Sequence, residues 1–179
     1  MKTLAAVPLL ALATGSLAQE EAPKPTKYHE FLKQFEGTWE GTVKFSMEPG
    51  QEPIVSKGTM TEKLSCGGLW LVYEWKGEMM RQPFTGHGLM GYDVKKGKYV
   101  SVWVDSWMTA VGTSEGTCDE KGRVFTMAGE DDDAKSGKKV KRKEVTEFAD
   151  ADNWKMTFSV VGDGGKDFVM MTIEMKRKK

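Results

Sequence analysis

The chain has 179 residues, with 26 basic and 26 acidic side chains, and 39% of its residues are hydrophobic. This length corresponds to about one domain with a sizeable core. A near-neutral chain has no excess of charge to attract nucleic acid or an anionic membrane surface, so we expect neither as a partner.

Residues 1–18 have the pattern of a secretory signal peptide. Lys2 provides a short positive start, an apolar run extends to Ala13, and a small-x-small cleavage site precedes Gln19. The run is shorter than the roughly 20 apolar residues that cross a bilayer. We therefore expect residues 1–18 to be removed and the mature protein to be secreted or periplasmic, without a membrane span.

Residues 19–27 contain two prolines and several charges without apolar periodicity, which predicts a flexible leader before a single domain over 28–179. At the start of that domain, apolar residues fall at the spacing of one helix face, and Gly37 follows as a stop. These residues are Tyr28, Phe31, Leu32 and Phe35. The pattern predicts a short helix that covers one end of the rest of the domain.

The remainder of the chain alternates between apolar and polar residues in short segments separated by Gly, Pro, Asp and Asn. This pattern predicts about ten strands. Their expected ranges are 38–47, 53–65, 69–79, 83–93, 98–107, 109–118, 123–131, 139–148, 153–161 and 167–178. Short turns between them favour antiparallel hairpins. A closed up-and-down barrel hides the edges of such a sheet most completely, with a two-sheet sandwich as the alternative.

Segments 83–93 and 98–107 are unusually rich in glycine and aromatic residues. In the second segment one face carries Tyr99, Ser101, Trp103, Asp105 and Trp107, and the other carries valines. We expect the ring face to point inward, because a barrel of about ten strands encloses more space than valines fill. If the valine face points inward instead, the rings become outer surface and a candidate dimer contact.

Several motifs also carry a resemblance to a known family. GTWEG, MMRQPFTGHGLMGYD, KYVSVWVDSW, SEGTCDEKGRVFTMAGE, SGKKVKRKEVTEF and FVMMTIEMKRK follow one another in the order found there. The chain resembles the family catalogued as domain of unknown function 1579 over residues 28–178. The resemblance implies a calycin-like antiparallel barrel, related to the lipocalin and nitrobindin groups, often exported and without an established activity. Cys118 departs from the aromatic residue more common at its position.

No cofactor or metal is expected. His29 and His87 are the only histidines, whereas a zinc centre normally needs three or four converging ligands. The similar nitrobindin barrels hold haem through a His near the C-terminal end, and the C-terminal strands here contain none. The twelve methionines leave an unusual haem ligand open. The acidic residues 130–133 and the basic residues 138–143 are expected to pair as a solvated hairpin rather than to bind calcium.

Asp105 is the carboxylate of greatest interest, because a partly buried Asp is either hydrogen-bonded, paired or raised in pKa. Its structural interpretation is a carboxylate bound to neighbouring backbone or to an Arg. Its functional interpretation is an enzyme that uses Asp105 with His87. Cys66 and Cys118 allow one disulfide, or a nucleophile beside His87, although exported thiols are more often oxidised or buried.

Taken together, these patterns favour an exported barrel that binds a small apolar or amphipathic molecule and is not an enzyme. The alternatives are a filled barrel that acts as a structural or protein-interaction module, possible as a homo-oligomer, and the enzyme based on Asp105 and His87. The expected ligand-binding residues are Trp103, Asp105, Tyr99, Trp107, Phe84, His87, Met90 and Tyr92.

Overall fold

The structure is a computed structural model that describes residues 21–132, 137, 139–162 and 167–179. The predicted signal peptide, residues 1–18, lies outside the described residues. Residues 21–26 have no regular secondary structure and lead into α1 (Lys27–Glu30), which continues as the 3-10 helix η1 (Phe31–Phe35). A second 3-10 turn, η2 (Cys66–Gly68), follows the second strand.

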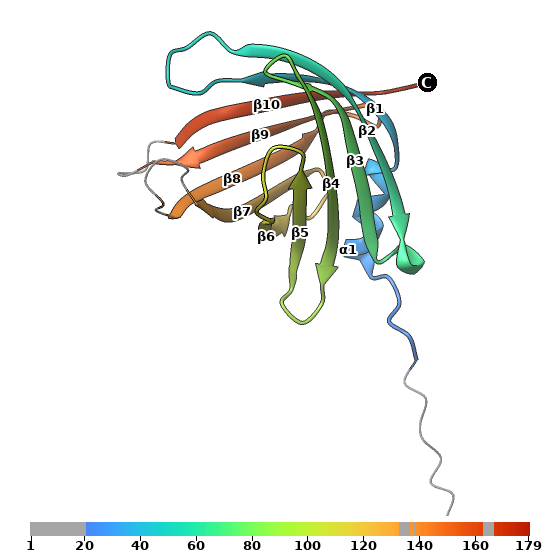
Figure 1. The fold of residues 1–179 in the computed structure, drawn as a ribbon. Coiled ribbons are helices and arrows are strands. Elements are labelled where there is room, and N and C mark those ends of the chain that lie inside the picture. The colour runs from blue at the N-terminus through green and yellow to red at the C-terminus, as the bar shows by residue number, and fades with distance from the viewer. Residues whose placement is uncertain (1–20, 133–136, 138, 163–166) are drawn as a thin grey trace, which may run out of the picture.

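Ten antiparallel strands form a closed barrel in the order β1-β10-β9-β8-β7-β6-β5-β4-β3-β2 (Figure 1). The strands are β1 (Gly37–Phe45), β2 (Ile54–Ser65), β3 (Trp70–Met79), β4 (Gln82–Asp93), β5 (Lys98–Asp105), β6 (Gly112–Cys118), β7 (Val124–Asp132), β8 (Lys139–Phe148), β9 (Asn153–Val161) and β10 (Asp167–Arg177). Each strand pairs with its neighbours in sequence, and β1 pairs with β10 to close the sheet.

The predicted fold class is therefore confirmed: the sheet is an antiparallel up-and-down barrel with a short N-terminal helix. Most strand bounds agree with the sequence prediction within two residues. The exception is the β5–β6 connection, where β5 ends at Asp105 and β6 begins only at Gly112. Among the described residues, no helix has the length and apolar character needed to cross a membrane.

The N-terminal helix begins with a capping arrangement built on Thr26 and His29. The Thr26 hydroxyl accepts from the amide of Tyr28, and the Thr26 amide donates to Nδ1 of His29 at 3.0 Å. These contacts satisfy amide groups that the first turn of a helix leaves unpaired. His29 is buried, and burial lowers the pKa of its imidazole. Its role is structural.

The helix α1 lies at one end of the barrel (Figure 1), which its apolar side chains help to close. Leu32 and Phe35 are almost fully buried, and the Phe35 ring lies 4.7 Å from Phe148 and 5.2 Å from Phe125, centroid to centroid. Tyr28 stacks on Tyr92 with centroids 4.3 Å apart. We call this the helix-covered end; the turns after β1, β3 and β5 lie at the other, far end.

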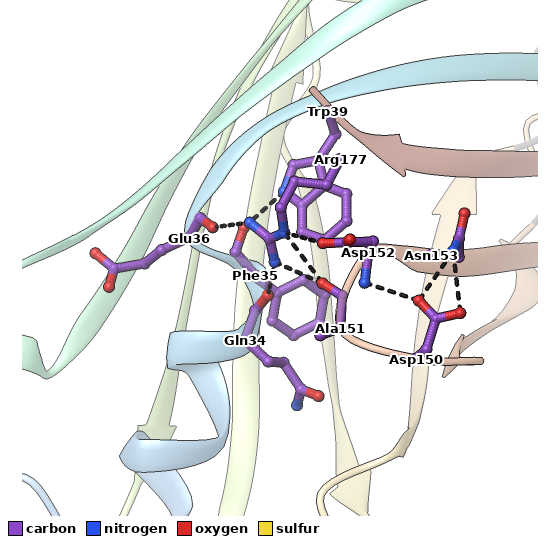
Figure 2. A network of polar contacts seen from close by, with 9 residues as sticks. All are labelled: Gln34, Phe35, Glu36, Trp39, Asp150, Ala151, Asp152, Asn153 and Arg177. Atoms are coloured by element: carbon purple, nitrogen blue, oxygen red, sulfur yellow. Dashed lines mark hydrogen bonds and ion pairs between the residues drawn. The ribbon is translucent and has the colours of Figure 1, made fainter. Parts of the chain in front are cut away.

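Arg177, near the C-terminal end of β10, connects three parts of the helix-covered end (Figure 2). Its guanidinium donates to the carbonyls of Glu36 at 2.6 Å, Gln34 at 3.0 Å and Ala151 at 2.9 Å. The same group lies 3.9 Å from the centroid of the Trp39 ring. Because Arg presents several donors in a planar fork, one side chain joins the helix, the β8–β9 turn and the last strand.

The barrel interior is packed near the helix and partly accessible further from it. Trp39 and Leu71 are fully buried, and the exposed fraction of Tyr99 is 1%. Other inward side chains are only half-buried: Phe45, Tyr73, Trp103, Met156 and Met171. In a closed sheet, water reaches an inward side chain through the interior or from an open end, so these side chains lie where solvent can enter the barrel.

Candidate functional site: the barrel interior

Two aromatic rings form one wall of the interior. Trp103 on β5 and Tyr73 on β3 lie nearly parallel, with centroids 5.9 Å apart and an angle of 20° between the planes. Both are half-buried and project from inward positions on either side of β4. The ring face of β5 thus points inward, and Val102 and Val104 point to solvent.

The positions of these two rings explain why β4 contains glycines. Gly88 lies directly opposite both Tyr73 and Trp103 in the sheet, and Gly86 lies opposite Trp75. A Cβ added at Gly88 would collide with the Tyr73 ring, and one added at Gly86 would collide with the Trp103 ring. Glycine at these positions lets the rings lie flat against the barrel wall, in place of side chains from β4.

A charged cluster occupies inward positions on β7 and β8. Arg142 donates from Nε to Glu144 at 3.0 Å, from Nη1 to Asp131, and from Nη2 to the carbonyl of Thr113 at 2.9 Å. The Arg142 side chain is only 7% exposed, whereas that of Glu144 is 21% exposed. Charge-assisted hydrogen bonds of this kind are what allow an Arg to be buried.

Glu62 on β2 is a buried carboxyl group beside the ring wall. It lies opposite Tyr73 in the sheet, is 6% exposed, and its Oε2 has no hydrogen-bond partner among the described residues. Burial raises the pKa of Glu62 well above its usual value, and Arg177 and Trp39 oppose the rise. Burial, with the Glu144 and Glu62 carboxylates, also raises the pKa of the Tyr73 phenol.

The Asp105 carboxylate is bound to neighbouring N–H groups, as its structural interpretation predicts. One carboxylate oxygen accepts from Trp103 Nε1 at 3.0 Å, and the other accepts from the amides of Trp107 at 2.8 Å and Met108 at 3.0 Å. These bonds end β5 and start the connection to β6, which explains why the strand is shorter than predicted. Asp105 also fixes the indole of Trp103 from the inner side.

The structure does not bring His87 into the interior, and it lies on the other face of the sheet from the expected binding residues Trp103 and Asp105. His87 points outward between Gly86 and Gly88, its side chain is 61% exposed, and its Nε2 lies 3.8 Å from Glu74. Strand alternation places it on the opposite face of the sheet from Asp105. The alternative of an enzyme that pairs Asp105 with His87 is therefore not supported.

The other predicted binding residues divide between the two ends of the barrel. Tyr99 donates to the carbonyl of Tyr28 at 2.8 Å, and Tyr92 stacks on Tyr28, so both support the helix. Met90 is buried. Phe84 is buried towards the far end, where Trp107 packs edge-on against it at 5.4 Å from an exposed position beyond β5. Only Trp103 and Asp105 border the charged and aromatic groups described above.

The cysteines are not bonded to each other in the structure, so the possible disulfide is not formed there. Cys66 is exposed and Cys118 is half-buried. Burial and the neighbouring Asp119 raise the pKa of the Cys118 thiol to about 12. A thiol of this kind is a poor nucleophile at neutral pH.

A broad groove also crosses the outer face of β2, β1, β10 and β9. Outward charged side chains of both signs line it, among them Lys57, Glu174 and Lys176. Such alternating charges are typical of a solvated sheet face, and the Trp103–Tyr73 wall, Glu62 and the Arg142 cluster do not line it. Among the described residues, no three potential metal ligands gather at one point.

Comparison with known proteins supports this architecture. The profile of the family described as protein of unknown function (DUF1579) matches residues 24–177. The chain belongs to this family. No curated protein matches this DUF1579 member.

Two solved structures resemble the DUF1579 barrel in fold. Rv2717c from M. tuberculosis matches with a TM-score of 0.61 and 14% identity, over 86% of this chain and 99% of that one. The S-type phycobiliprotein lyase CPES from Guillardia theta matches with a TM-score of 0.57 and 14% identity, over 84% and 92% of the two chains. At this identity the likeness shows the fold alone.

Sequence reasoning missed most of the interior polar groups. Residues 130–133 and 138–143 were expected to form a solvated hairpin, and Asp132 with Lys139 does so. Asp131 and Arg142, however, point inward. The signal was present in the alternation of 139–148, where Arg142 and Glu144 share a face with Phe148. The density of Lys and Glu on the other face concealed it.

Proposed function

We propose that this protein binds a small amphipathic molecule inside the barrel. The observation that carries the proposal is that inward aromatic and methionine side chains remain partly accessible within a closed sheet, next to polar groups. Accessible apolar walls with a few polar groups are typical of ligand sites. The ligand body would lie against Trp103 and Tyr73, and its polar end would face Glu144 and Glu62.

The comparisons support the proposal at the level of fold. The phycobiliprotein lyase shares the barrel, and the interior of a barrel of this size holds either side chains or a ligand. The signal peptide predicted for residues 1–18 further supports action after export. On this proposal the molecule is held by apolar contact and oriented by few hydrogen bonds.

Nile red, a neutral, flat and solvatochromic dye, tests the proposal. Its emission should increase and shift to shorter wavelength on binding to the protein. Trp103→Ala should weaken binding by about tenfold, because it removes one aromatic contact surface worth about 1.4 kcal/mol. Val104→Ala is the matched control, since it lies next along β5 on the outer face and should leave the affinity unchanged.

Absence of any emission change, or equal weakening by Trp103→Ala and Val104→Ala, would contradict interior binding. Circular dichroism of both variants separates loss of the site from loss of the fold.

A second candidate function, protein interaction, is favoured by one surface feature. Val72, Leu89 and Val102 lie side by side on the outer face of β3, β4 and β5, and all three are exposed. Adjacent exposed apolar residues are typical of contact surfaces. If this face is the functional one, Leu89→Asp should abolish self-association or partner binding in sedimentation experiments and leave Nile red binding unchanged.

A further inference from the structure

The inward strand positions carry an uneven set of charges. Among the described residues, these positions carry two basic side chains, Arg142 and Arg177, and several acidic ones. The acidic residues are Glu62, Asp105, Asp131 and Glu144. Arg177 shares the inward face of β10, but its guanidinium is bound to backbone carbonyls at the helix-covered end. Because burial raises the pKa of Glu62, the excess of negative charge rests on Asp105, Asp131 and Glu144 against Arg142.

Arg142 is screened from an anionic ligand by its own acidic partners. Each of its three guanidinium nitrogens already donates, to Glu144, to Asp131 and to the carbonyl of Thr113. Its side chain is 93% buried behind these partners. These three bonds use three of its five N–H donors, and an anion that entered the barrel would meet Glu144 first, whose side chain is the more accessible.

The acidic groups, in contrast, retain capacity to accept hydrogen bonds. Glu62 Oε2 is buried and has no partner among the described residues. Glu144 is bound to Arg142 through one oxygen. Asp105 accepts from neutral N–H groups and forms no ion pair with a described residue. Carboxylates confined in a low-dielectric interior attract cations more strongly than the same groups in water.

The aromatic wall favours the same sign of charge. The Trp103 and Tyr73 rings lie parallel on the wall and are partly accessible from the interior. The indole N–H of Trp103 donates to Asp105, which places a carboxylate at the ring edge. An ammonium or guanidinium group over such a face gains a cation–π interaction, most strongly with Trp. The buried Trp75 Nε1, which also has no partner in the described part of the chain, is a neutral donor and does not offset these charges.

We propose that the barrel is selective for cations: its ligand is an amphipathic amine, or a related organic cation, and not a carboxylate or phosphate amphiphile. This inference rests on the proposed binding of a small molecule in the interior. The cationic group would lie between the Trp103–Tyr73 wall and the oxygens of Glu144 and Glu62.

Calorimetric titration with three probes that share one aromatic body tests this selectivity. Naphthylmethylamine is a cation at neutral pH, naphthylmethanol is neutral and naphthylacetate is an anion. The amine should bind about tenfold more tightly than the alcohol, the size of one desolvated cation–π contact, and the acetate more weakly than the alcohol. The advantage of the amine should shrink in high salt.

Glu144→Gln should reduce the advantage of the amine and leave the affinity for the alcohol unchanged, because the amide keeps the shape of the side chain and removes its charge. Glu174→Gln is the matched control, since Glu174 is exposed on the outer face of β10 and pairs with Lys44.

An acetate that binds as tightly as the amine, or an amine that binds no better than the alcohol, would overturn the charge selectivity and leave interior binding standing. Failure of all three probes to bind would overturn the proposed function itself. An unchanged amine advantage in Glu144→Gln would remove Glu144 from the cation site and contradict the proposed geometry.

Discussion

At the scale of single residues, Glu62 is the group whose environment differs most from water. It is buried next to Tyr73, and the rise in its pKa comes mainly from the loss of solvent around the charged form. The folded protein therefore holds this proton over a pH range in which the unfolded chain releases it. This difference makes stability depend on pH.

Glu62→Gln should remove this dependence. Because the pKa of Glu62 is higher in the folded state, its contribution to stability is complete below the ordinary value of 4.5 and is lost as pH rises through the folded pKa. The free energy of unfolding of the variant should thus increase relative to wild type as pH rises above that value. Urea unfolding at a series of pH values measures the difference, with Glu174→Gln as the control. Parallel pH profiles for wild type and Glu62→Gln would be inconsistent with a raised pKa.

The inward face of a strand could be predicted from the sequence where large aromatic and small apolar residues alternate clearly. The face of β5 that carries Trp103 and Asp105 was assigned correctly, because rings and valines separate cleanly along that strand. Alternation shows which face of a strand a residue occupies but not its position along the barrel axis. Tyr92 and Tyr99 were therefore predicted as ligand contacts, whereas in the structure they contact Tyr28 of the helix. His87 was included among the expected contacts because its segment is rich in glycine and aromatic residues, although strand alternation places it on the outer face.

At the scale of elements, the helix-covered end depends on contacts that join distant segments. Arg177 on β10 contacts Gln34 and Glu36 after the helix, and Ala151 in the β8–β9 turn (Figure 2). Trp39 adds a ring beneath the guanidinium and donates its own N–H to Phe35 at 2.7 Å. The helix is short, so such contacts rather than its own hydrogen bonds hold it in place.

Arg177→Lys should therefore destabilise the protein by about 2 kcal/mol, because Lys keeps the charge but loses the planar fork that serves three carbonyls. Hydrogen exchange should show the largest loss of protection in α1, η1 and β1. Lys176→Met, one residue away and exposed, should change stability by less than about 0.5 kcal/mol. A Lys variant as stable as wild type would show that charge alone maintains this end.

Strand positions were predictable because turn residues and alternation recur throughout the chain. The β5–β6 connection was not predictable, because Asp105 and the residues after it continue the alternating pattern. In the structure, the Asp105 carboxylate accepts from the amides of Trp107 and Met108, and the strand ends there. The helix was located correctly from four apolar residues. The spacing of these apolar residues did not predict that the α-helix α1 continues as the 3-10 helix η1.

At the scale of the whole molecule, closure of the sheet produces two different environments from one set of strands. Inside, rings lie flat over glycines and leave accessible surface beside carboxylates. Outside, charged side chains are frequent, and the exposed Val72, Leu89 and Val102 form an apolar patch across β3, β4 and β5. The sequence predicted that the sheet closes and that aromatic residues point inward. The inward charged residues became evident only from the observed register of β2, β7 and β8.

The most direct test of interior binding is a methyl NMR spectrum recorded during titration with naphthylmethanol. The methyl groups of Met156 and Met171 point inward and are half-buried, whereas those of Val72 and Val102 are exposed on the outer face. Interior binding predicts concentration-dependent shifts of the two methionines, with the valines unchanged. Shifts confined to Val72 and Val102 would contradict it and would place the ligand on the outer face of the barrel.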